Sequence, residues 1–219
     1  MRNSLWLMLG LAGCASPAGM QVRGDVAADA ETIRIAAVGD GLAMGPWQAS
    51  GVDRGWSYAY ESGFGTLRRE DAQRTWAFTL EGGREQRLHV ACLTTERGEA
   101  LDIAGLDASR GHALLSCAVR DEEGRRIGRL ALPVDGGEER GFVAVDGLRI
   151  AIASAHELVG GSESRDAAGF EFRDDTRALG ALQMVNEKIL WVPRSVDDES
   201  RETIAVAAAA LALYDGAGG

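Results

Sequence analysis

The apolar run Ile204–Tyr214 constrains the fold more than any other segment of this chain. Its residues are mostly alanine and the run is unbroken, which favours an α-helix. At 1.5 Å per residue, a helix of about 11 residues is only about 16 Å long and cannot span a bilayer. It has no polar side, and a helix that is apolar all round must be buried all round. The rest of the chain must therefore enclose it.

The residues that flank this run set the bounds of the helix. Ser195 or Asp197 can cap its N-terminus, and the acidic run 197–199 places negative charge in the first turn, where the helix dipole favours it. Asp215 and Gly216 stop it. We predict a helix over about residues 197–214.

The rest of the chain alternates between apolar and polar residues in short runs separated by turn signals, which indicates antiparallel β-structure. The alternation begins near Thr32 and ends near Val192. The clearest runs are Trp76–Leu80, Leu88–Leu93, Leu115–Val119, Ile127–Leu132, Phe142–Val145, Leu148–Ala153, Phe170–Phe172, Leu179–Val185 and Ile189–Val192.

Two features identify individual hairpins. Asp146-Gly147 between two apolar runs can supply both positive φ angles of a type I′ turn. Residues 118–130 also resemble residues 171–182, since both read as a strand, an acidic turn, an arginine and a second strand. This similarity predicts the same hairpin built twice. We interpret the acidic turns, including Asp174-Asp175, as solvated tips and not as a metal site.

A strand meander around a buried C-terminal helix resembles the tubby and LURP-one family, which includes the phospholipid scramblases. The resemblance covers Leu115–Tyr214 best, through its Asp-x-x-Gly hairpins, the hairpin pair of Phe170–Val192 and the terminal helix. It implies a mainly β fold in which a closed antiparallel barrel of about a dozen strands encloses the helix. A β-sandwich with the helix on one face is the alternative.

The N-terminus has the layout of an export signal. Arg2 supplies a positive charge, Leu5–Leu11 is a short apolar stretch, and small residues lead to Cys14. The last four residues, Leu11-Ala12-Gly13-Cys14, resemble the lipobox of bacterial lipoproteins, whose cysteine receives a diacylglycerol. The resemblance implies that residues 1–13 are a signal peptide and that Cys14 is lipidated. An ordinary cleaved signal peptide is the alternative.

The resemblance also implies a location and a domain plan. In lipoproteins an aspartate after the cysteine favours the inner membrane, and Ala15 stands there, so we expect the outer membrane of a bacterial envelope. Residues 14–31 are small and polar and predict a flexible tether. Residues 32–219 are expected to form one β-rich domain.

Composition limits the partners of this domain. The net charge of −10, with no basic patch evident in the sequence, argues against nucleic acid and anionic lipid headgroups. The lipid on Cys14 makes the membrane a partner, and an envelope protein or lipid is a further candidate partner. We expect no cofactor and no metal, because no zinc-ligand spacing accompanies the histidines.

Two cysteines follow Cys14 along the chain. Cys92 and Cys117 each alternate in phase with apolar neighbours, so each is expected on the buried side of a strand. An exported protein occupies an oxidising compartment, which makes them a candidate disulfide. Two buried free thiols are the alternative.

No motif identifies a catalytic site. The loop 39–45 is glycine-rich, but Pro46 follows too soon for the helix that a phosphate loop needs, so a turn is favoured. His89 is out of phase with its buried neighbours and is expected in solvent. Ser116 and His156 could join an aspartate in a dispersed triad, since triads are defined by geometry and not by sequence order.

Trp56, Tyr58 and Tyr60 alternate on one side of a strand. They could line a carbohydrate or lipid groove, but packing in the core is the more common use of such residues.

The sequence therefore predicts a lipid-anchored envelope protein with a non-catalytic binding or structural role. A hydrolase with a dispersed Ser/His site and a lipid-binding barrel of scramblase type are the alternatives.

Overall fold

A computed structural model describes residues 18–64, 67–84, 87–103, 106–135 and 138–215. Two helices and twelve strands occur within these ranges. The helices are α1 (Gly24–Ala27) and α2 (Asp198–Asp215). The strands are β1 (Ala30–Val38), β2 (Gly41–Met44), β3 (Trp47–Phe64), β4 (Leu67–Glu81), β5 (Leu88–Ile103), β6 (Leu106–Arg120), β7 (Arg126–Asp135), β8 (Glu138–Val145), β9 (Leu148–Ala155), β10 (Gly169–Arg173), β11 (Ala178–Gln183) and β12 (Ile189–Pro193).

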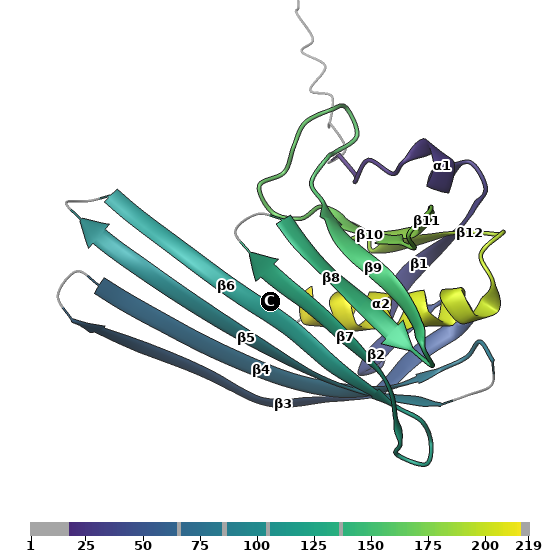
Figure 1. Ribbon diagram of the computed structural model, residues 1–219, viewed down its shortest axis with the longest axis horizontal. Coiled ribbons are helices and arrows are strands. Elements are labelled where there is room, and N and C mark those ends of the chain that lie inside the picture. The colour runs from purple at the N-terminus through teal and green to yellow at the C-terminus, as the bar shows by residue number, and fades with distance from the viewer. Residues whose placement is uncertain (1–17, 65–66, 85–86, 104–105, 136–137, 216–219) are drawn as a thin grey trace, which may run out of the picture.

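The strands form a closed antiparallel barrel (Figure 1). Each strand pairs with the next along the chain, and β1 pairs with β12 to close the sheet, with Thr32 opposite Trp191. Closure leaves the barrel itself without exposed sheet edges, which would otherwise invite pairing with other chains. Beyond Ala49, however, β3 pairs with β4 alone among the described strands. The predicted mainly β fold, with a closed barrel around one C-terminal helix, is confirmed.

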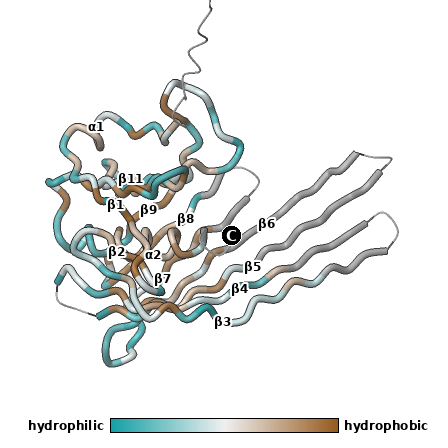
Figure 2. Tube along the Cα trace, turned by 180° about the vertical axis from the view of Figure 1, so that it is seen from behind, coloured by the Kyte–Doolittle hydropathy of each residue, from teal (hydrophilic) through white to brown (hydrophobic). Residues whose placement is uncertain are grey.

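Helix α2 lies inside the barrel and is the centre of the hydrophobic core (Figures 1 and 2). Every residue from Ile204 to Leu213 is at most 4% exposed, and the inward side chains of the strands pack against this segment. The alanines of α2 have short side chains, which lets the surrounding strands approach its backbone closely. The predicted burial on all sides is confirmed.

The turns follow the predicted chemistry. Asp146 and Gly147 both have positive φ angles, 50° and 88°, as a type I′ hairpin requires. The β6–β7 and β10–β11 hairpins repeat one design, because each has a register shift just before its acidic turn, at Val119/Arg120 and at Phe172/Arg173. The internal similarity in the sequence thus corresponds to one hairpin used twice.

Residues 18–31 differ from the expected flexible tether. Met20 and Val26 are 3% and 1% exposed, and they pack against the outside of the barrel beside Ala168 and Ala181. The backbone N–H of Met20 donates to Oε1 of Gln183 at 2.9 Å. The prediction of a tether that reaches residue 31 is therefore wrong for residues 18–31, because their few apolar side chains pack in a second, smaller hydrophobic cluster.

Strands β3 to β6 continue beyond the barrel as a four-stranded arm (Figure 1). They contain 15 to 18 residues each, whereas the other strands have at most 10. Strand β3 has two register shifts where it leaves the barrel, at Ser50/Asp53 and Arg54/Ser57. Such bulges bend a strand and increase its twist, which directs the arm away from the barrel wall.

A disulfide joins Cys92 and Cys117 at the root of this arm. The two residues lie directly opposite each other on β5 and β6, with their Cα atoms 4.0 Å apart, and both side chains are buried. Nearby, the ring of Trp76 stacks on Tyr214 near the end of α2, with ring centres 6.0 Å apart. The root of the arm is therefore tied both within the sheet and to the helix.

Candidate functional site

The candidate lipidation residue, Cys14, lies outside the described residues. Its chain continues into the fold at Ala18, whose carbonyl oxygen accepts a hydrogen bond from the side chain of Asn186. Within the described part of the chain, neither helix combines the length and hydropathy that crossing a membrane requires.

Ser116 and His156 do not come together in the triad that sequence order left open. His156 hydrogen-bonds to Ser154 and to the backbone of Ser164, whereas Ser116 is an exposed residue on β6. His89 is exposed, as predicted, and its Nδ1 lies 3.2 Å from the hydroxyl of Thr79.

The contact between Ser154 and His156 nevertheless has the geometry of a nucleophile and a base. A carbonyl oxygen only accepts hydrogen bonds, so the contact of 3.2 Å between the Ser164 oxygen and Nδ1 of His156 requires that Nδ1 carry the proton. Nε2 then accepts the hydroxyl hydrogen of Ser154 at 3.0 Å. Both side chains are half-buried where β9 ends, and neither lines the two hollows described below.

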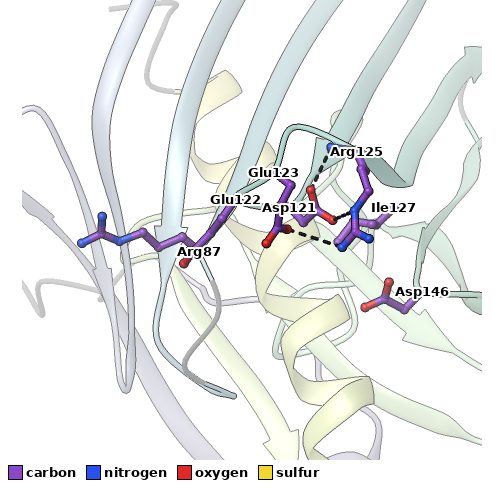
Figure 3. A pocket seen from close by; sticks show the side chains of 7 residues that line it. All are labelled: Arg87, Asp121, Glu122, Glu123, Arg125, Ile127 and Asp146. Carbon is purple, nitrogen blue, oxygen red and sulfur yellow. Dashed lines mark hydrogen bonds and ion pairs between the residues drawn. The ribbon is translucent and has the colours of Figure 1, made fainter.

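The first hollow, of about 360 Å³, lies at the end of the barrel where α2 begins (Figure 3). Arg87, Asp121, Glu122, Glu123, Arg125, Ile127 and Asp146 line it. Figure 3 shows Arg125 directed at Asp121, and the backbone N–H and Nε of Arg125 donate to this carboxylate at 2.8 and 2.7 Å. Burial raises the pKa of Asp121, but the hydrogen bonds from Arg125 outweigh that effect and hold the pKa below its ordinary value.

These contacts are those of a stable turn and not of a ligand site. The carboxylate of Asp121 is occupied by its own hairpin, and Glu123 also faces Arg125, at 3.4 Å. Among the described residues, no group of three or more potential ligands could hold a metal ion. We therefore interpret this hollow as a structural feature of the barrel end and not as a binding site.

An ion pair between a buried carboxylate and a partly exposed arginine lies nearby. Glu202, in the first turns of α2, is 2% exposed, and its Oε2 accepts hydrogen bonds from Nε and a terminal nitrogen of Arg84, each at 2.7 Å. The contact with Glu202 raises the pKa of the Arg84 guanidinium. Oε1 of Glu202 and Nε1 of Trp47 are both buried without a hydrogen-bond partner. This cluster ties the β4–β5 connection to the helix.

The second hollow lies where the arm leaves the barrel and has a volume of about 300 Å³. Its lining is largely small or apolar, with two polar side chains, and comprises Asp53, Gly55, Thr75, Trp76, Ala77, Ala91, Cys92 and Leu93. The hydroxyl of Thr75, which lines this hollow, donates to the backbone oxygen of Trp56 at 3.4 Å, so the hollow lies next to the following part of β3.

That part of β3 carries an aromatic strip, which we define as Trp56, Tyr58 and Tyr60. Their side chains are 59%, 50% and 52% exposed. The rings of Tyr58 and Tyr60 are nearly parallel, with centres 6.3 Å apart. Core packing, the more common use of such residues, is therefore wrong here. Tyr58 pairs with Gln73, which is out of phase with the buried Trp76, so the strip lies on the face of the sheet away from α2.

No family model, curated protein or solved structure matches this chain.

Proposed function

We propose that this protein is a lipid-anchored component of a bacterial envelope, held by Cys14, that binds a neutral glycan along β3. The observation that carries the binding role is the exposure of the aromatic strip, three large rings side by side on one strand. Monomeric proteins seldom expose large contiguous apolar patches without a partner for them. The rigid barrel around α2 is then a scaffold that presents the arm.

The chemistry of the strip and of the adjoining hollow supports a glycan. Sugar rings have apolar C–H faces that pack on aromatic rings, and their hydroxyls donate to carboxylates. The strip supplies the rings, and Asp53 supplies an acceptor near its end. Ala77 and Ala91, beside Asp53 on β4 and β5, line the hollow with short side chains. The strong negative charge of the protein disfavours an anionic polymer at this surface.

Sedimentation with insoluble chitin, an uncharged polymer of N-acetylglucosamine, tests the binding role. Replacing all three residues of the strip with alanine should lower the bound fraction at least tenfold, since aromatic side chains dominate the energetics of such contacts. The control replaces Val38 and Val159, two other exposed apolar residues, with alanine and should bind like the wild type. Equal binding by the strip variant would contradict the proposal.

Cell fractionation tests the anchor separately. The variant Cys14→Ser cannot carry the diacylglycerol, so it should leave the membrane fraction while the wild type stays in it. An unchanged distribution would exclude lipid anchoring. The location of Ala15 after Cys14 supports the outer membrane, so the wild type should separate with outer-membrane vesicles.

One observation favours a second candidate function, hydrolysis. The hydrogen bond from Ser154 to His156 provides a nucleophile and a base that the Ser164 carbonyl orients. A fluorophosphonate probe should then label the wild type and not Ser154→Ala. Absence of labelling would assign this contact a purely structural role.

A further inference from the structure

The outer wall of β7 to β10 gathers positive charge on an otherwise acidic protein. Arg129 and Arg149 flank Phe142, and Arg140 and Arg173 lie further along the same outer face; we call these four residues the arginine wall. Strand register places Arg129 and Arg149 on either side of Ala144, and Phe142 next to Ala131 and Ala151. The sequence-based premise that no basic patch offsets the net charge is therefore wrong, because residues from four strands meet only in the folded barrel.

Two guanidinium groups converge at the centre of this wall. The guanidinium carbon of Arg149 lies 3.7 Å from the centre of the Phe142 ring, and that of Arg129 lies 4.8 Å from it. The face of an aromatic ring attracts cations, so Phe142 holds both groups in place. In the described part of the chain, no ion pair joins either arginine to a carboxylate.

The two guanidinium groups on the Phe142 ring carry like charges close together, and an anion beside them would offset their repulsion. Guanidinium groups present several N–H donors in a plane, a geometry that suits phosphate oxygens. Ala144 lies between Arg129 and Arg149 on the sheet, and Ala151 lies opposite Phe142. Their short side chains leave the sheet surface between the two arginines uncovered. Arg173 adds charge at the rim, although it also lies 4.0 Å from Glu171.

The path of the N-terminus indicates where such phosphates come from. Met20 forms a bridge with Leu158, three residues beyond the end of β9, and the N–H of Val159 donates to the oxygen of Gly19. Strand β9 carries Arg149 at its other end, next to the turn from β8. Only three residues separate Cys14 from Ala18, a reach of about 14 Å at full extension. A lipid on Cys14 therefore holds the barrel against the bilayer by the end of β9, and a barrel that lies with β9 along the surface brings Arg149 to the same membrane.

We propose that the arginine wall lies against the membrane and binds the phosphates of its anionic lipid headgroups, which fixes the orientation of the anchored barrel. This inference rests on the proposed lipid anchor. The net charge of −10 does not prevent the contact, because charges more than about 8 Å from the surface are largely screened at physiological ionic strength. With the wall on the membrane, the arm remains available for its own ligand.

Vesicle sedimentation tests this proposal in the full chain carrying Cys14→Ser, so that no attached lipid contributes. The vesicles contain either phosphatidylcholine alone or equal parts of phosphatidylcholine and phosphatidylglycerol. The apolar stretch Leu5–Leu11 is present in every variant, so the quantity compared is the ratio of partition coefficients between the two vesicle types.

This ratio should fall roughly tenfold in Arg129→Ala/Arg149→Ala, because each arginine near an anionic surface adds to the attraction and this variant removes two of them. The matched control, Arg34→Ala/Arg194→Ala, removes the same charge from two other exposed positions and should keep the wild-type ratio. Circular dichroism verifies that each variant is folded, which the exposure of all four side chains leads us to expect.

Two results would overturn the proposal. An equal fall in the control would show attraction by overall charge and not by the wall. Displacement from the vesicles by inorganic phosphate at constant ionic strength would show a discrete phosphate site instead of a membrane surface. Either failure leaves the anchor intact if fractionation of wild type and Cys14→Ser gives the expected difference, so the two proposals fail separately.

Discussion

Single carboxylates fix the turns of this barrel, and Asp174 shows how. Its Oδ1 accepts hydrogen bonds from the backbone N–H and the hydroxyl of Thr176 and from the N–H of Arg177, at 2.7, 2.8 and 2.8 Å. These bonds favour the charged form, and they lower the pKa of Asp174 from 3.8 to about 2. Asp121 has the same position in the β6–β7 hairpin, where it accepts from Arg125.

The lowered pKa of Asp174 predicts a pH dependence. A carboxyl whose folded-state pKa is depressed adds stability above its unfolded pKa, near 3.8, and this stability is lost as the pH falls toward about 2. The variant Asp174→Asn keeps the acceptor oxygen but cannot titrate. We expect its urea midpoint to fall less than that of the wild type between pH 5 and about 2.

Asp175→Asn is the matched control for that experiment, because it removes the same charge one residue further along. It should retain the acid sensitivity of the wild type. If Asp174→Asn and Asp175→Asn have identical acid profiles, the turn contacts of Asp174 do not affect stability.

The pair of Arg84 and Glu202 predicts an asymmetry between variants. Arg84→Ala leaves the carboxylate of Glu202 buried at 2% exposure without its counter-charge, which should cost about 2–3 kcal/mol of unfolding free energy. The double variant Arg84→Met/Glu202→Leu removes both charges and should recover part of this loss. Chemical denaturation measures both. A double variant less stable than Arg84→Ala would show that the pair itself stabilises the fold.

At the scale of elements, α2 and the strands depend on each other. The helix begins after Asp197, whose carboxylate accepts from the backbone N–H of Ser200 at 2.9 Å and caps it. Its side chains from Ile204 to Leu213 find no solvent, and the inward side chains of the strands have no other apolar surface to cover. Neither part can bury its apolar surface without the other.

Ala208→Glu should therefore prevent folding, since Ala208 is fully buried and a carboxylate there has no partner. Expression in soluble form and the cooperative unfolding transition are the measurements. The control Ala36→Glu makes the same change at an exposed position of β1 and should fold normally. A soluble Ala208→Glu variant with a wild-type transition would mean that α2 is not enclosed.

The sequence predicted those features that depend on local patterns. The unbroken apolar run Ile204–Leu213 predicted a buried helix, and Asp146-Gly147 predicted a hairpin. Both predictions depend only on residues that are neighbours in the sequence. The exposure of Trp56 and the meeting of Arg129 with Arg149 depend on where β3 leaves the barrel and on the register of β7 to β9. Such relations join distant segments, so the aromatic strip and the arginine wall appear only after folding.

At the scale of the whole molecule, the barrel combines three surfaces. The end near Met20 and Leu158 carries the short connection to Cys14, the wall around Phe142 carries the arginines, and the arm carries the aromatic strip. One closed sheet holds all three in fixed relation, because β1 and β12 pair and α2 fills the interior. In the arrangement that we propose, the arm faces the compartment while the arginine wall meets the membrane.

Amide hydrogen exchange, followed by mass spectrometry, tests most directly the central claim that the closed barrel encloses α2. The backbone of α2 from Ile204 to Leu213 should exchange only through global unfolding, with the slowest rates in the protein, whereas the loop of residues 156–166 should exchange fast. Exchange of the α2 segment at rates near those of that loop would contradict the closed barrel around a buried helix.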